Sequence, residues 1–186
     1  MENLLIYYGW LNSFNSAANG WDNEKVAQEL SRYDVLAFGD GLADSGHGDY
    51  ANTKVIIPRI KALNPSAKIF GYVTTNQALT AFKDKTDDWM DNSDFGSDVD
   101  GVFMDESGYD FGKTRSEFND RVDYVHGKHS STGLCFANAW KPDHVLGTVN
   151  DPSYPNSTFM LLLYLTGALL KVDFTSTTEA GTITVY

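Results

Sequence analysis

Residues 100 to 112 read DGVFMDESGYDFG, an apolar segment that runs directly into acidic and aromatic residues. The apolar part, positions 101–104, has the composition of a buried β-strand, and the polar residues mark where it ends. Two carboxylates, Asp105 and Glu106, stand side by side at that end. The stretch therefore predicts a buried strand whose carboxyl end carries acids.

Four other segments of the chain resemble this one. They are NLLIYYGW from Asn3, DVLAFGD from Asp34, KIFGYV from Lys68 and GLCFANAW from Gly133, and with GVFMDE they recur about every 32 residues. Stretches with helical periodicity lie between them. One strand and one helix per step predict βα units joined into a parallel sheet.

Helix boundaries can be predicted at several places. Asp22 or Asn23 is expected to cap a helix that ends before Tyr33 and buries Val26, Ala27 and Leu30. The capping-box sequence TRSE, Thr114 to Glu117, predicts the start of another helix. A less sharply defined helix is expected between Gln77 and Met90.

A further helix is expected from about Asn52 to Leu63. Its predicted buried residues are Val55, Ile56 and Ile60. Pro58 inside it is expected to kink the helix or delay its start.

The strands are continuously hydrophobic, which indicates burial on both faces in either a barrel or an open doubly wound sheet. The first strand is not followed by the G-x-G-x-x-G loop of nucleotide-binding sheets. Polar residues instead follow every strand, which favours an α/β fold of the (β/α) TIM-barrel type, shortened at the C-terminus. Residues 1–150 are expected to form the barrel-like units, and residues 151–186 a sixth strand and irregular tail of the same domain.

The predicted strand ends combine acids with aromatic and amide side chains, as a sugar site requires. The candidate catalytic residues are Asp105, Glu106 and Asp40, and the candidate substrate-binding residues are Tyr8, Trp10, Tyr72, Asn138 and Trp140. Adjacent strand residues point to opposite faces, so Asp105 and Glu106 can share a face only if the strand has already ended. The expected pair is therefore one of these two acids with a carboxylate from another strand, such as Asp40.

The motifs YDVLAFGDGL, KIFGYV, GVFMDESGYDFG and CFANAW resemble those of a TIM-barrel family related to glycoside hydrolase family 114, the endo-α-1,4-polygalactosaminidase-like proteins. Members of that family also occur as modules in phage and prophage proteins. The resemblance covers roughly residues 3–150. It implies a (β/α) barrel, hydrolysis of a galactosamine-containing polysaccharide, and Asp105 as the acid of the fourth strand.

The C-terminal part departs from that family. Eight units of this size need roughly 250 residues, whereas the chain has 186. The stretch STFMLLLYLTGALL is a candidate sixth strand, but Leu163 to Leu165 supply no acid where the family places one. An open sheet edge beside apolar residues 159–170 favours association into a homo-oligomer or larger assembly.

Composition limits the partners and compartments. A net charge of -11 argues against nucleic acid and anionic membrane surfaces as partners. The longest late apolar run, Phe159 to Leu170, is too short to span a bilayer, and the first residues lack the features of a signal peptide. The single cysteine, Cys135, is expected in the core. Cytoplasmic and virion-associated locations both remain open.

No cofactor or metal is expected. The loop DGLADSGHGDY contains Asp40, Asp44, His47 and Asp49 but lacks the spacing of a calcium loop, so it is interpreted as solvated. The histidines His126, His129 and His144 belong to no paired metal motif and are expected at the surface.

Three functions remain compatible with the sequence. The first is a glycosidase-like enzyme that acts on an amino-sugar polysaccharide. The second is a non-catalytic carbohydrate-binding or structural module, for example in a phage particle, that keeps the barrel without turnover. The third is a nucleotide-binding open sheet, for which NSFNSAANG is a poor phosphate loop.

Overall fold

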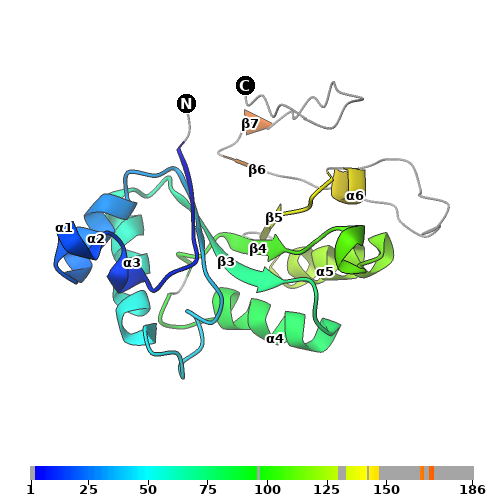
Figure 1. The fold of residues 1–186 in the computed structure, drawn as a ribbon, viewed down its shortest axis with the longest axis horizontal. Coiled ribbons are helices and arrows are strands. Elements are labelled where there is room, and N and C mark those ends of the chain that lie inside the picture. Colours follow the sequence, from blue (N-terminus) through cyan, green and yellow to red (C-terminus); the bar gives the residue numbers. More distant parts are fainter. Residues whose placement is uncertain are drawn as a thin grey trace.

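A computed structural model describes residues 3–95, 97–129, 133–141 and 143–146, together with the pairs 164–165 and 168–169. Five parallel strands form the central sheet and pair in chain order (Figure 1). They are β1 (Leu4–Tyr7), β2 (Val35–Phe38), β3 (Lys68–Thr74), β4 (Gly101–Asp105) and β5 (Leu134–Ala137). The five strands predicted from the repeat are thereby confirmed.

Helices connect these strands. The long crossovers are α2 (Asn23–Leu30), α3 (Tyr50–Leu63), α4 (Leu79–Met90) and α5 (Arg115–Lys128). The shorter helices are the 3-10 helices η1 (Leu11–Ser13) and η2 (Tyr109–Phe111), and α1 (Ser16–Asn19) and α6 (Asp143–Leu146). Each crossover advances by one strand in the same direction, so right-handed connections place the long helices on the same side of the sheet (Figure 1).

The two faces of the sheet have separate apolar clusters. On the helix side, residues such as Leu36, Ile69, Val102 and Cys135 pack with the buried positions of the helices. On the other side, a cluster built from the strands alone contains Val35, Ala37, Phe70 and Phe103, with Tyr72, Leu134 and Phe136 packed against it. All residues of β2, and all residues of β4 except its last, are buried. This confirms the burial on both faces that was expected for these two strands.

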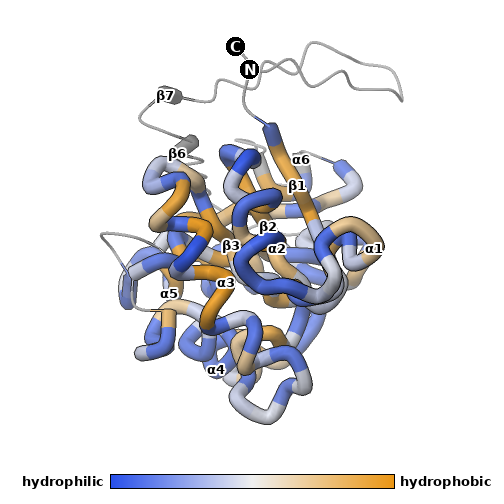
Figure 2. Tube along the Cα trace, turned by 90° about the vertical axis from the view of Figure 1, so that its left-hand side faces the viewer, coloured by the Kyte–Doolittle hydropathy of each residue, from blue (hydrophilic) through white to orange (hydrophobic). Residues whose placement is uncertain are grey.

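β1 differs from that expectation. Leu4 and Ile6 are exposed, although Figure 2 shows β1 as a hydrophobic stretch. Both residues lie on the face of the smaller cluster, as their register partners Val35 and Ala37 do. Among the described strands β1 stands first in the order and pairs with β2, and the prediction of burial on both faces was wrong for this strand.

Two predicted helix starts are confirmed. Asp22 caps α2, and its side chain accepts hydrogen bonds from the N–H groups of Glu24 and Lys25. Thr114 and Glu117 form the predicted capping box at the start of α5. Both caps depend on residues within one turn, which is why the sequence reveals them.

The prediction for α3 was wrong for Val55, and of the two effects expected of Pro58 the delayed start does not occur. The helix starts at Tyr50 and contains Pro58, so the proline does not delay its start. Val55 is exposed, because the buried residues Thr53, Ile56, Ile57 and Ile60 follow the i, i+3, i+4, i+7 stripe that excludes it.

The C-terminal region is described only at two short strands. β6 (Tyr164–Leu165) and β7 (Ala168–Leu169) pair antiparallel in a sheet of their own. Among the described residues these four pair with one another and not with β5, so they do not form the expected sixth parallel strand. The rest of residues 151–186, including the predicted tail, lies outside the described residues. In the described part of the chain, no helix combines the length and apolar character needed to cross a bilayer.

Candidate functional site

Parallel pairing brings the carboxyl ends of the strands to one edge of the sheet. Asp105, the last residue of β4, is in register with Thr74, the last residue of β3. Tyr72 and Phe103 are in register two residues earlier, so Tyr72, Thr74 and Asp105 share the face of the smaller cluster. Asn138 follows β5, and its N–H donates to the carbonyl of Met104 over 2.9 Å.

Two hydrogen-bond donors hold the side chain of Asp105. Its Oδ1 accepts from Nδ2 of Asn138 at 2.8 Å and from the N–H of Glu106 at 2.9 Å. The hydroxyl of Tyr72 is near this carboxylate, because Asp105 is one of the causes that raise the pKa of Tyr72. The hydrogen bond from Asn138 fixes the orientation of Asp105 relative to β5, which a carboxylate needs in order to act at a defined place.

Glu106 lies outside the strand. Its backbone is left-handed, with φ of 55°, and this conformation turns the chain directly after Asp105. The Thr74 hydroxyl donates to Oε2 of Glu106, and the N–H of Asn76 donates to that hydroxyl oxygen at 3.0 Å. The condition set by the sequence is therefore met: the strand has ended, and both adjacent acids contact residues of β3.

Two tyrosines respond to these acids. Burial, followed by the charge of Asp105, raises the pKa of Tyr72 well above its ordinary value. Burial and the charge of Asp105 also raise the pKa of Tyr8. The two rings meet edge to face with centroids 5.7 Å apart. Both hydroxyls consequently remain protonated near neutral pH and are available as donors.

Asp40 follows β2 at the same edge of the sheet but has a different partner. Its Oδ1 lies 3.2 Å from Nζ of Lys85 on α4. Its charge is the weakest of the contributions that raise the pKa of Tyr72, behind those of Asp105 and Glu106. The structure thus brings Asp105 and Glu106 together, and it keeps Asp40 nearby in an ion pair.

The remaining candidate residues are exposed aromatics. Tyr8 is 57% exposed and Trp140 is 82% exposed. Trp10 is also exposed, and its ring packs edge-on against His47 at 5.5 Å. Tyr8 and Tyr72 are therefore linked to Asp105, whereas Trp10 contacts the loop after β2.

The polar side chains of the loop DGLADSGHGDY bond both within the loop and to neighbouring elements. Asp44 accepts from the N–H of Gly46 at 2.8 Å, and Nδ1 of His47 accepts from the N–H of Asp49 at 3.1 Å. Asp49 is buried and accepts from Nδ2 of Asn52 at 2.7 Å. These contacts organise the loop and the start of α3.

The expectation for the histidines was wrong in part. His129 is buried at the end of α5, between Asp87 and Asp91 of α4. His144 is largely covered, because its ring stacks on Tyr109 with centroids 4.2 Å apart. The i, i+4 spacing of Asp87 and Asp91 was visible in the sequence, but nothing there identified His129 as their neighbour.

A comparison with protein-family models, curated proteins and solved structures found no match. The chemistry at the strand ends is therefore the basis for a functional proposal.

Proposed function

We propose that this chain is a glycoside hydrolase-like protein that acts on an amino-sugar, galactosamine-containing polysaccharide by carboxylate acid and base chemistry. The observation that carries the proposal is the meeting of Asp105, Glu106, Tyr72 and Asn138 at the ends of β3, β4 and β5. Glycoside hydrolysis requires two carboxyl groups, one to protonate the leaving oxygen and one to act as base or nucleophile.

We assign the principal role to Asp105. The Oδ1 atom of Asp105 accepts hydrogen bonds from the side chain of Asn138 and the N–H of Glu106. An accepting oxygen is what a base or nucleophile provides. Glu106 is the preferred partner, because Asp40 is engaged by Lys85. Asn138 orients Asp105, Tyr72 lies beside it, and the exposed ring of Tyr8 offers a surface on which a sugar can stack.

We infer a partial (β/α) barrel as the scaffold. The consecutive strand order and the helices on one side support it. A doubly wound nucleotide-binding sheet reverses its strand order at the ligand site, and the five described parallel strands run in chain order throughout. This order favours the barrel over the nucleotide-binding alternative.

A non-catalytic carbohydrate-binding or structural module, for example in a phage virion, is the second candidate. It is favoured by the ion pair of Asp40 with Lys85, which removes a carboxylate from another strand as the catalytic partner. In this alternative the strand ends bind a glycan or another subunit, and Asp105 serves as an acceptor for hydroxyl or ammonium groups.

The test is reducing-end release from partially deacetylated poly-galactosamine and a panel of bacterial surface glycans. We expect Asp105→Asn to lower the rate by about 10²–10⁴, the usual contribution of general acid–base catalysis. Asp123→Asn, on the exposed side of α5, is the matched control and should retain full activity. Calorimetry with the same glycans measures binding separately.

The outcomes separate the candidates. Hydrolysis that is lost in Asp105→Asn and kept in Asp123→Asn supports the enzyme. Saturable glycan binding without turnover supports the module. A folded protein that neither cleaves nor binds any of the glycans would overturn both proposals.

A further inference from the structure

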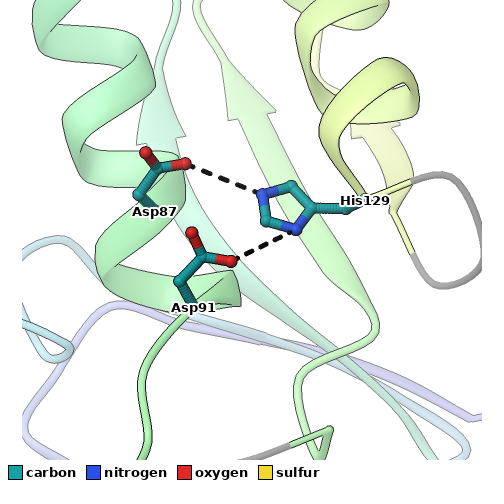
Figure 3. Close-up of side chains that lie close together, drawn as sticks. All are labelled: Asp87, Asp91 and His129. Atoms are coloured by element: carbon teal, nitrogen blue, oxygen red, sulfur yellow. Dashed lines mark ion pairs between the residues drawn. The ribbon is translucent and has the colours of Figure 1, made fainter.

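Three side chains from the ends of two helices form a compact cluster away from the carboxyl ends of the strands. Asp87 and Asp91 lie one turn apart at the end of α4, and His129 follows the last residue of α5 (Figure 3). One ligand atom from each residue lies within 4.8 Å of the others. The end of α4 precedes β4 and the end of α5 precedes β5, so the cluster is at the amino ends of the strands, opposite Asp105.

The imidazole of His129 is buried and faces both carboxylates. Its side chain is only 7% exposed, and its Nε2 has no hydrogen-bond partner among the described residues. Nε2 lies 3.7 Å from Oδ1 of Asp87, and Nδ1 lies 3.6 Å from Oδ1 of Asp91. A buried ring nitrogen that makes no hydrogen bond is costly unless something else satisfies it.

The distances themselves indicate what that partner is. Charge-assisted hydrogen bonds between nitrogen and a carboxylate oxygen are about 2.7–2.9 Å long, shorter than both separations. Two ligands bound at about 2.1 Å to one tetrahedral ion lie about 3.4 Å apart. One ion binds only one of the two ring nitrogens, because their lone pairs point in different directions, so the spacing that applies is that of the unbonded nitrogen. Nε2 lies 3.7 Å from Oδ1 of Asp87, which is close to that spacing, and Asp91 supplies the third ligand atom of the group.

The surrounding groups hold the carboxylates in place. Nζ of Lys128 lies 2.5 Å from Oδ2 of Asp87 and 2.7 Å from Oδ2 of Asp91. The Tyr124 hydroxyl donates to Asp87, 2.7 Å from Oδ1 and 2.9 Å from Oδ2. Lys128 thus engages the Oδ2 atoms, while the Oδ1 atoms face the histidine. Hydrogen bonds of this kind orient metal-binding carboxylates in known sites.

We propose that Asp87, Asp91 and His129 bind a divalent transition-metal ion of the Zn²⁺ class and thereby join α4 to α5. Imidazole nitrogen suits Zn²⁺ and its neighbours, whereas Mg²⁺ and Ca²⁺ prefer oxygen ligands alone. Three protein ligands leave a fourth position for water. The site is independent of the glycan proposal, because it lies at the other end of the sheet.

The test uses the full chain after treatment with a chelator. Titration with ZnCl₂ by calorimetry is expected to give one ion per chain, and CoCl₂ is expected to give the visible absorption of a tetrahedral site. Asp91→Asn and His129→Gln should each weaken the affinity at least tenfold. His126→Gln, on the same helix and outside the cluster, should bind as the wild type does.

Thermal unfolding supplies a second measurement. Excess ZnCl₂ should raise the Tm of the wild type and of His126→Gln equally, and it should raise that of Asp91→Asn by less. If His129→Gln fails to fold, Asp91→Asn still decides the question, because its side chain is half exposed and the change is nearly isosteric. Absence of binding, or binding unchanged in Asp91→Asn, would overturn the proposal.

Discussion

Thr74, the last residue of β3, donates its hydroxyl hydrogen to Oε2 of Glu106, which follows the last residue of β4. The bond spans two neighbouring strand ends. It is possible because Glu106 has a left-handed backbone, an unusual conformation for a residue with a long side chain. The acid is therefore held at this edge against the preference of its own backbone.

The left-handed conformation of Glu106 predicts that a glycine at this position is more stable than an alanine. Glu106→Ala keeps the strained φ and loses the bond to Thr74, whereas Glu106→Gly loses the bond and relieves the strain. We expect the Gly variant to be more stable than the Ala variant by about 1 kcal/mol. Urea unfolding of both variants measures the difference. An Ala variant that equals or exceeds the Gly variant would contradict the assigned conformation.

Asp100 is expected to be important for stability. Its carboxylate lies 2.6 Å from Nζ of Lys61 and 2.9 Å from Nζ of Lys68, and it accepts from the N–H of Ile69 at 2.9 Å. Asp100→Asn leaves largely buried lysines without their counter-charge, and a loss of about 3 kcal/mol in the free energy of unfolding is expected. Denaturant titration provides the value, and a loss below about 1 kcal/mol would show that the network is dispensable.

Replacing Asp98 is expected to stabilise the protein, whereas replacing Asp100 destabilises it. Burial, with a smaller contribution from Asp100, raises the pKa of Asp98, although Lys61 opposes the shift. An acid with a raised pKa in the folded state destabilises the fold as the pH rises from its unfolded pKa, about 3.9, through the folded value. Asp98→Asn should therefore be more stable than wild type at neutral pH. The gain should disappear below about pH 4, where the carboxyl is protonated in both states. Unfolding at pH 7 and pH 3 tests both signs.

Gly71 of β3 lies directly beneath the indole of Trp89. A Cβ at this position would overlap the ring, which is buried and donates from Nε1 to the carbonyl of Tyr72 at 3.1 Å. We expect Gly71→Ala to cost about 1–3 kcal/mol through overpacking. Combining it with Trp89→Leu should cost less than the sum of the two single changes, because the smaller side chain makes room. Additive costs would show that the two positions do not compete for space.

Cys135 is expected to react only when the protein unfolds. It is fully buried on β5, and burial raises the pKa of its thiol to about 12. The reactive form is the thiolate, so Ellman's reagent should label the native protein slowly at pH 8 and label the urea-unfolded chain at once. Rapid stoichiometric labelling of the native protein would place this thiol at the surface.

Much of the fold is predictable because its signals are local. The five strands are runs of apolar and β-branched residues, and the caps at Asp22 and Thr114 use contacts within one turn. The prediction fails where burial depends on neighbours. Val55 has the same composition signal as Ile57, yet only the helix stripe decides which of them is buried. Leu4 and Ile6 are exposed, and β1 is the first strand of the sheet that the described residues form.

The sequence predicts which residues lie at the strand ends, but it does not predict which of them contact one another. A repeat of about 32 residues predicts that the strand ends meet at one edge, but it does not set the register that places Thr74 opposite Asp105, since paired residues are 31 apart here and 33 apart between β2 and β3. The left-handed turn at Glu106 has no signal, since glutamate is not typical of that conformation. The pairing of Asp40 with Lys85 and the meeting of His129 with Asp87 and Asp91 join segments far apart in the chain. No local pattern encodes such contacts.

The consecutive strand order has a consequence for how the chain reaches this structure. Leu4 pairs with Val35, Val35 with Lys68, Phe70 with Gly101 and Gly101 with Leu134, so these pairings close segments of 31, 33, 31 and 33 residues. The entropy lost on closing a loop grows with the logarithm of its length, so no step among these four is much costlier than another. Folding can therefore proceed by adding one unit at a time to a neighbour that is already formed, and a break in the chain between two units would interrupt this progression without disturbing the units before it.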